Sequence, residues 1–247
     1  MTDDERAGVR PALTSAMVLA AGLGKRMRPL TADMPKPLVP VLGRTLLDRV
    51  LDRLAAAGIE RAVVNVHYMG DQIEAALAMR ERPEIRISDE RDELLDTGGG
   101  VKRALPLLGD GPFLIHNSDS IWVEGPERVF DLMGRTWNDA EMDALLLLAM
   151  TTSSTGYHGR GDFAMDSEGR IVRPHEHGVV PFVFTGVSIA HPRLFGDTPD
   201  GPFSLNTVWD RAIDTGRVHG LRLEGSWMHV GSPAGLAEAE AALQESN

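Results

Sequence analysis

The stretch of residues 17–40 constrains the fold more than any other part of the chain. It begins with the apolar run 17–21 and continues through Gly22 and Gly24. A short apolar run that ends at glycine indicates a buried strand. Glycines let the backbone turn sharply and approach a ligand, so that consecutive N–H groups can face an anion. The stretch therefore predicts a strand followed by an anion-binding turn.

Basic side chains follow this turn at two separate places. Lys25 and Arg26 come directly after the second glycine, and they supply positive charge for phosphate groups. Lys36 lies between Pro35 and Pro37, which favour an extended backbone and should give the lysine a defined direction. Two basic positions beside a glycine turn predict a triphosphate site with a second ligand next to it.

Two common phosphate-binding loops are excluded by the residues after the glycines. A Walker loop needs a hydroxyl residue directly after its lysine to hold magnesium, but Arg26 follows Lys25. A dinucleotide fingerprint needs a third glycine where this chain has Met27. A metal ion must therefore be held by residues from elsewhere in the chain.

Strand-like and helix-like segments alternate through the first 150 residues. Apolar periodicity predicts strands over 62–68, 84–88, 113–117 and 144–150, and helices over 45–57, 71–78, 97–106 and 126–136, the third entered through a tight turn at 96–100. Such alternation predicts an α/β fold with a Rossmann-like, mainly parallel sheet flanked by helices. Ligands of these sheets lie at the carboxyl ends of strands, so we expect the 22–26 turn and Asp119 to face one crevice.

The second half of the chain predicts additional strands rather than a further repeat. A hairpin is expected over 162–173, strands over 182–190, 219–224 and 227–230, and helices after Ser204 and Ser232. No linker-like composition separates the halves. We therefore expect a single domain over 15–247, preceded by a disordered polar tail over 1–14.

Composition narrows the possible function classes. The net charge is −11 without a basic stripe, which argues against a nucleic-acid partner. The chain has no cysteine, so a disulfide framework and a cysteine nucleophile are excluded. Its apolar runs are too short to cross a membrane, and residues 1–10 lack the features of a signal peptide. These observations predict a cytoplasmic protein that is not bound to a membrane.

Several blocks of the sequence resemble the sugar-1-phosphate nucleotidylyltransferases. The blocks are LAAGLGKRMRPLT with MPKPLVPV in residues 19–41, DTGGG at 96–100, NSD at 117–119, GYHGRGDF at 156–163, FTGVSIAHP at 184–192 and WMHVG at 227–231. Together they are most similar to the bacterial N-acetylmuramate-1-phosphate uridylyltransferases of peptidoglycan recycling. The resemblance implies an enzyme that transfers a nucleoside monophosphate from a nucleoside triphosphate, here UTP, to a sugar 1-phosphate and releases pyrophosphate.

The resemblance also implies roles for individual residues. Catalytic roles fall to Lys25, Arg26 and Lys36. Nucleotide or substrate binding is expected at Ala21, Gly22, Gly24, Thr97, Gly98, Gly99, Asn117, Gly161, Asp162 and Gly186. Asp119 resembles the aspartate that binds magnesium, for which manganese is the alternative, because magnesium is held by one or two carboxylates together with substrate oxygens.

His229 departs from the family pattern, which usually has a second metal-binding aspartate there. Three interpretations stay open: magnesium is held by Asp119 and substrate phosphates, a softer ion is bound by His229, or catalysis is lost. Arg173 stands where many relatives have a lysine that binds the sugar phosphate, and His175 and His177 beside it are interpreted as a loop.

Two alternative functions remain at this stage. The same chemistry could use other substrates, as in a mannose-1-phosphate guanylyltransferase, a glucose-1-phosphate thymidylyltransferase or a cytidylyltransferase. A non-catalytic, nucleotide-binding regulatory protein is the alternative of a different class, and His229 supports it. The expected partners are small molecules only, and the protein is expected to be a monomer or a small homo-oligomer.

Overall fold

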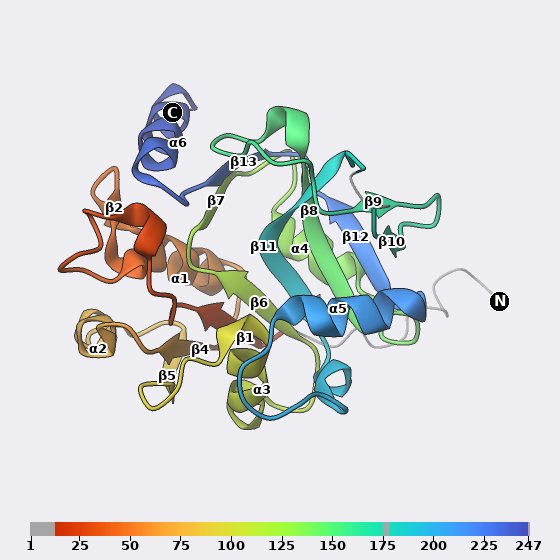
Figure 1. Ribbon diagram of the computed structural model, residues 1–247, viewed down its shortest axis with the longest axis horizontal. Helices are drawn as coiled ribbons and strands as arrows, with labels where there is room; N and C mark the ends of the chain where they lie inside the picture. The colour runs from red at the N-terminus through yellow and green to blue at the C-terminus, as the bar shows by residue number, and fades with distance from the viewer. Residues whose placement is uncertain (1–12, 175–177, 247) are drawn as a thin grey trace.

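The computed structural model describes residues 13–174 and 178–246, which are built around one mixed, seven-stranded sheet (Figure 1). The strands in order across the sheet are β12 (Val218–Arg222), β8 (Ala144–Met150), β11 (Phe182–Ala190), β6 (Phe113–Asn117), β1 (Ser15–Leu19), β4 (Arg61–Val66) and β5 (Glu84–Asp89). Only β11 runs antiparallel to its sheet neighbours. The predicted mainly parallel sheet is therefore confirmed.

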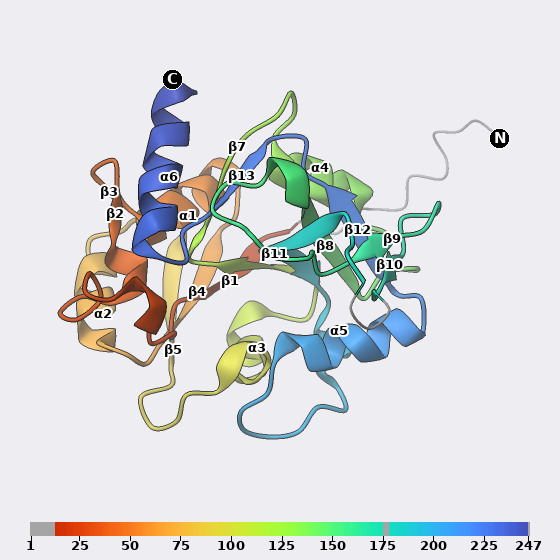
Figure 2. The same cartoon turned by 45° about the horizontal axis from the view of Figure 1, so that its top comes forward.

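Helices cover both faces of this sheet, as Figures 1 and 2 show. One face packs against α1 (Leu46–Ala56), α2 (Gly70–Leu77) and α4 (Val129–Thr136). The other face packs against α3 (Asp96–Leu108) and α5 (Leu205–Asp214). The buried side chains of the sheet alternate between these two layers, as expected for a strand with a side-chain period of two.

A smaller cluster lies beside the main sheet and holds the last helix, α6 (Pro233–Glu245). It contains the short pairs β2 (Pro40–Val41) with β3 (Arg44–Thr45), and β7 (Ser120–Val123) with β13 (Ser226–His229). A separate hairpin joins β9 (Ala164–Met165) to β10 (Ile171–Val172), as predicted for the second half. Four short 3-10 turns complete the described elements: Lys25–Met27, Lys36–Leu38, Thr151–Ser153 and Pro192–Phe195.

Helix α1 shows how local sequence sets an element. The side chain of Thr45 accepts a hydrogen bond from the backbone N–H of Asp48 at 3.0 Å, which caps the first turn. Its leucines and Val50 recur on one face and are buried against the sheet. The chain leaves the helix at Gly58, whose φ of +81° suits glycine. The predicted helix is confirmed.

The beginning of α3 differs from the prediction. The glycine-rich segment 96–100 suggests a tight turn, but the structure continues the helix through it from Asp96. Tertiary packing explains why glycines occur in this helix: a Cβ atom on Gly98 would lie 2.4 Å from the ring of Phe203, and one on Gly99 would lie 2.5 Å from the carbonyl oxygen of Gly201. The glycines are therefore required by close approach of the 201–203 loop. Pro106 lies inside α3, which extends beyond the predicted end to Leu108.

Two smaller predictions are also corrected. Pro35 is extended as expected, but Lys36 and Pro37 form a 3-10 turn rather than an extended segment. Helix α4 begins at Val129 instead of Pro126. Strand β7 was not predicted. Of the proposed tail, residues 1–12 lie outside the described residues, whereas Leu13 packs against the core.

Membrane crossing needs a helix of about 20 apolar residues. Among residues 13–174 and 178–246, no helix has the length and apolar character to span a bilayer.

Candidate active site

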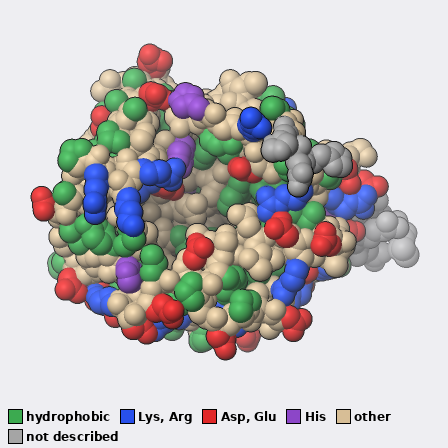
Figure 3. Space-filling view, viewed as in Figure 1, with side chains coloured by type: hydrophobic (Ala, Val, Ile, Leu, Met, Phe, Trp, Pro, Cys, Tyr) green, Lys and Arg blue, Asp and Glu red, His purple; other side chains and the backbone are tan. Residues whose placement is uncertain are grey.

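A cleft of about 510 Å³ opens at the carboxyl ends of β1, β4 and β6. The face shown in Figure 3 is hollowed near its middle, and Lys and Arg side chains gather along one side of the hollow. Nine of the residues predicted from the sequence line the cleft: Ala21, Gly22, Gly24, Lys25, Arg26, Lys36, Thr97, Asn117 and Asp119. The expected crevice between the glycine turn and Asp119 therefore exists.

The loop after β1 is shaped for an anion. Gly24 has a φ of +60°, and its carbonyl oxygen accepts hydrogen bonds from Met27 N–H at 2.9 Å and from the Thr31 hydroxyl at 2.8 Å. Met27 is fully buried and anchors the 3-10 turn, while Lys25 and Arg26 stay exposed at the cleft. A rigid backbone with two free-standing cationic side chains can hold phosphate groups without rearranging.

Asn65 bonds to the backbone at the start of this loop, and Glu90 in turn bonds to Asn65. The side-chain oxygen of Asn65 accepts hydrogen bonds from the N–H groups of Ala20 at 2.7 Å and Ala21 at 3.3 Å, and its amide nitrogen donates to Glu90 at 2.7 Å. Glu90 is fully buried, and burial raises the pKa of its carboxyl although hydrogen bonds from Asn65 and Leu95 oppose this. Both residues line the cleft and were not predicted.

Lys36 and Asp119 form an ion pair in the cleft, with 2.5 Å between Nζ and Oδ2. Their side chains are 13% and 21% exposed. Burial alone would raise the pKa of Asp119, but the charge and the hydrogen bond of Lys36, together with further contributions from its surroundings, outweigh it and hold that pKa below its usual range. Asp119 is therefore ionised at neutral pH and can accept a cation or order the lysine.

His229 lies next to this pair but does not itself line the cleft. It is the last residue of β13, opposite Ser120 of β7, and its Nε2 packs so closely that a Cβ on Gly231 would lie 2.2 Å away. Burial lowers the pKa of His229; the charge of Asp119 opposes this, and the charges of Lys36 and Arg26 add to it. The imidazole is therefore neutral at pH 7, and Gly231 forms the cleft wall in front of it.

The segment at the start of α3 that was predicted to bind the nucleotide has only one of its three residues, Thr97, in the cleft. Thr97 lines the cleft, and its hydroxyl accepts a hydrogen bond from Leu205 N–H at 2.9 Å. The N–H groups of Gly98 and Gly99 both donate to the carbonyl oxygen of Phe203, at 2.8 and 3.1 Å. These two glycines therefore position the 201–203 loop, and their contact with a nucleotide remains a prediction.

The remaining predicted residues lie on β11 and the segment that pairs with it. Gly186 has a φ of +82°, and a Cβ there would lie 2.6 Å from the side chain of Asn117, so this glycine makes room for a cleft residue. Gly161 N–H donates to the Tyr157 hydroxyl, and Asp162 accepts from Phe184 N–H at 2.9 Å. Gly161 and Asp162 do not line the cleft.

Arg173 is held by α5 through its bonds to Asp210 at 2.6 Å and Asn206 at 2.9 Å. His175 and His177, which were interpreted as a loop, lie outside the described residues.

The cleft offers a metal ion a single carboxylate at its reactive end. No group of three or more Asp, Glu, His or Cys side chains with the arrangement of a metal site occurs within the described part of the chain. Magnesium in phosphate-transferring sites keeps waters and substrate oxygens as most of its ligands and takes one or two carboxylates from the protein. Asp119 can supply that one carboxylate. The described residues do not provide a cage made of protein ligands alone.

Comparison with known proteins places this site among relatives. Residues 15–176 match the family described as nucleotidyl transferase. A protein of Caulobacter vibrioides named N-acetylmuramate alpha-1-phosphate uridylyltransferase is 52% identical over 235 residues, which cover 93% of this chain and 97% of that protein. The protein of the same name from Neisseria meningitidis serogroup B is 36% identical over 229 residues, 92% and 96% of the two chains. The fold also matches HddC from Yersinia pseudotuberculosis, with a TM-score of 0.75 at 20% identity, over 94% of this chain and all of that one.

Proposed function

Because this chain belongs to the nucleotidyl transferase family, we propose that it transfers the uridylyl group of UTP to N-acetylmuramate α-1-phosphate and releases pyrophosphate. The similarity to two uridylyltransferases over nearly the whole chain supports this choice of substrates. The structural observation that carries the proposal is the cleft, where the Gly22–Arg26 loop, Lys36 and Asp119 meet.

The reaction needs charge stabilisation more than proton transfer. An oxygen of the sugar 1-phosphate attacks the α-phosphorus of UTP, a new P–O bond forms, and the bond to the bridging β-phosphate oxygen breaks. The attacking phosphate has a second pKa of about 6, so it is largely a dianion at neutral pH and needs no general base. The protein must instead bring two anions together and stabilise the charge that spreads over the α-phosphate.

The residues of the cleft divide this task between them. Lys25, Arg26 and the loop N–H groups hold the β- and γ-phosphates, which become the leaving pyrophosphate. Lys36 provides the cation at the reacting end, and its ion pair with Asp119 at 2.5 Å keeps it pointed there. Asn65 fixes the backbone that carries the loop, so these positions are set before the nucleotide arrives.

Asp119 and substrate phosphate oxygens would hold magnesium, or alternatively manganese, which lowers the negative charge of the phosphates when bound. The single carboxylate beside Lys36 and the neutral, recessed His229 support this arrangement over a site made of two acids.

The decisive experiment measures pyrophosphate release from UTP, GTP, CTP and dTTP with N-acetylmuramate 1-phosphate and magnesium. We expect turnover with UTP, which falls by at least about 100-fold in Asp119→Asn because a charge aligned with the transition state is lost. The exposed residue Asp110 provides the matched control, Asp110→Asn, which should leave the rate unchanged.

The outcomes separate the proposal from its alternatives. Preference for GTP or dTTP in direct competition would replace it with a guanylyl- or thymidylyltransferase. Absence of pyrophosphate release with every nucleotide and sugar phosphate, with magnesium or manganese, would show that the protein binds nucleotides without reacting.

A further inference from the structure

A second cavity, of about 410 Å³, lies next to the cleft and shares a wall with it. It is bordered by α1, β7, the start of α4 and Leu243 of α6. The shared wall is the segment 116–122: its residues 117–119 line the cleft, whereas residues 116 and 120–122 line the cavity. The cavity is therefore separate from the candidate active site but is only one or two residues away from Asp119.

The cavity is positively charged although the chain carries a net charge of −11. Four arginines line it, Arg44, Arg49, Arg53 and Arg128, against two carboxylates, Asp52 and Glu124. Asp52 also pairs with Arg80 at 2.6 Å, outside the cavity lining, so it is shared between several cations. The local excess of positive charge points to an anionic ligand.

Arg49 and Arg53 are one helical turn apart on α1. Each guanidinium group has N–H donors that form no hydrogen bond within the protein. Arg49 donates to the carbonyl oxygen of Val41 at 2.6 Å, and Arg53 donates to that of Trp122 at 2.9 Å and lies 3.4 Å from Glu124. The Nε of Arg49 and the Nη1 of Arg53 are buried without a hydrogen-bond acceptor. Burial lowers the pKa of both arginines, and for Arg49 the charge of Arg44 adds to it.

Two further unpaired polar atoms belong to residues that line this cavity. His116 and Trp122 are each 1% exposed, and their Nε2 and Nε1 atoms have no hydrogen-bond partner. Within the described residues, eight buried side-chain nitrogen or oxygen atoms have no hydrogen bond, and four of them belong to this one cavity. Of these four, the Nη1 of Arg53 has only its 3.4 Å ion pair with Glu124. Buried polar atoms are rarely left unpaired, so such a concentration indicates a missing polar ligand.

The geometry restricts what that ligand can be. The Trp122 indole already stacks with two neighbours, the Arg53 guanidinium 3.7 Å from the ring centre and the His116 ring at 5.4 Å, so we expect no base to stack there. His116 bonds through Nδ1 to the carbonyl oxygen of Asn117, which makes Nδ1 the donor and leaves Nε2 as an acceptor. A ligand with anionic oxygens and one O–H hydrogen would satisfy both the arginines and this acceptor.

We propose that this cavity is a binding site for a compact phosphate, either inorganic phosphate or a small phosphomonoester. Phosphate oxygens match the fork of a guanidinium. Inorganic phosphate keeps an O–H hydrogen near neutral pH, and an ester such as glycerol 3-phosphate, a dianion there, offers a carbon-bound hydroxyl instead, whereas sulfate has neither.

The proposal is tested by isothermal titration calorimetry without substrates, so its outcome does not depend on the proposed reaction. Inorganic phosphate, glycerol 3-phosphate and sulfate are titrated at low ionic strength into the wild-type protein and into Lys25→Gln, which weakens any binding in the cleft. We expect Lys25→Gln to keep a phosphate site of wild-type affinity. This site should bind sulfate at least about tenfold more weakly than phosphate.

Variants of the cavity provide the second arm. Arg49→Gln and Arg128→Gln should each weaken phosphate binding about tenfold, whereas Arg86→Gln, which removes an arginine on the distant strand β5, should not. Arg128 makes a long, 3.5 Å bond to the carbonyl oxygen of Ala56, so its removal is expected to leave the fold intact even if Arg49→Gln does not. Thermal melting followed by circular dichroism checks each variant.

The source of the phosphate follows from the same titrations. Tighter binding of glycerol 3-phosphate indicates an ester, and tighter binding of inorganic phosphate indicates the free ion; either result supports the site. Loss of all phosphate binding in Lys25→Gln, unchanged binding in Arg128→Gln, or no binding of either phosphate at millimolar concentration would overturn it.

Discussion

His116 is a buried histidine in the wall between the cleft and the cavity. Burial lowers its pKa to about 4, and the nearby Arg53 charge acts in the same direction, against the bond to Asn117 and the charge of Asp119. In the unfolded chain, the pKa of His116 is roughly 6.5. Below that value the unfolded state takes up a proton that the folded state refuses, so stability is lost as the pH falls.

This histidine predicts a measurable pH dependence of the free energy of unfolding. When the pH is lowered from 7 to 5, His116 should reduce the free energy of unfolding of the wild-type protein by an amount on the order of 2 kcal/mol. Urea unfolding at the two pH values, compared between wild type and His116→Gln, measures it, because the variant should lose correspondingly less. His158→Gln removes an exposed histidine and should keep the wild-type difference. Equal pH differences in wild type and His116→Gln would show that His116 is not held neutral.

Sequence reasoning found the residues of the site that carry charge at loop ends, and it missed those that act from inside a strand. Lys25, Lys36 and Asp119 follow glycine, proline or a strand end, where a functional role is the natural interpretation. Asn65 lies within the apolar strand β4, and its two bonds to the loop depend on β1 lying beside β4. The amide side chain of Asn65 inside a buried strand was the only sign of its role in the sequence. Its partner, the loop after β1, could be known only from the fold.

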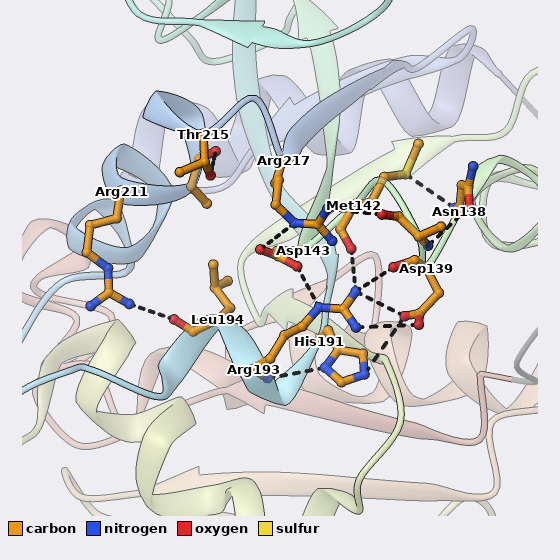
Figure 4. Close-up of polar contacts among 12 residues, drawn as sticks. Asn138, Asp139, Met142, Asp143, His191, Arg193, Leu194, Arg211, Thr215 and Arg217 are labelled. Atoms are coloured by element: carbon orange, nitrogen blue, oxygen red, sulfur yellow. Dashed lines mark hydrogen bonds and ion pairs between the residues drawn. The ribbon is translucent and has the colours of Figure 1, made fainter.

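At the level of elements, a polar network ties the ends of three sheet strands together (Figure 4). Asp143 lies just before β8 and bonds Arg193 at 2.6 Å, after β11, and Arg217 at 2.9 Å, before β12. Arg193 also donates to the carbonyl oxygens of Met142 and Asp139. Burial alone would raise the pKa of Asp143, but its bonds with the two arginines hold it below its usual range.

Removing the centre of this network should destabilise the sheet. Asp143→Ala leaves the partly buried guanidinium of Arg217 without its carboxylate and that of Arg193 with only Asp139, and we expect a loss of about 3 kcal/mol in the free energy of unfolding, measured in urea. The matched control is Glu127→Ala, which breaks an exposed pair with Arg135 and should change stability by no more than about 0.5 kcal/mol. A similar small loss for Asp143→Ala would show that the network contributes no more than a surface pair.

Elements with strong local periodicity were predicted well, and those fixed by distant contacts were not. The strands of the sheet and helix α1 carry runs of buried residues whose spacing already indicates their type. Strand β7 has only four residues and pairs with β13, about a hundred positions later in the chain. The glycines of α3 favour a turn locally, and their close packing against the 201–203 loop within a helix depends on contacts far apart in the sequence.

For the molecule as a whole, the family resemblance seen in the sequence is confirmed, and it explains how an acidic protein handles acidic substrates. Lys25, Arg26 and Lys36 line one cleft, and of the three carboxylates that line it too, Glu90 is fully buried and Asp119 is paired with Lys36, which leaves Lys25 and Arg26 as exposed cations. At about 0.1 M salt, charges more than roughly 10 Å away are largely screened. The nearby cations therefore outweigh the distant net charge in attracting a nucleotide.

This arrangement predicts a specific response to salt. The KM for UTP should rise several-fold between 50 and 500 mM NaCl while kcat changes less, because screening weakens ground-state attraction first. Lys25→Gln should start from a higher KM and show a shallower increase, whereas Lys102→Gln, which removes a lysine paired with Asp200 outside the cleft, should follow the wild type. Identical salt slopes for Lys25→Gln and wild type would contradict a direct phosphate contact at Lys25.

The position of β11 has a consequence for the order in which the chain can fold. β11 is inserted between β6 and β8, so these two earlier strands have no direct pairing to each other in the sheet. A nascent chain that has reached residue 176, where the family match ends, already contains β1, β4, β5 and β6 but leaves one edge of β6 open. Open strand edges attract other chains, so the interval before β11 is synthesised is the period in which this protein is most exposed to aggregation.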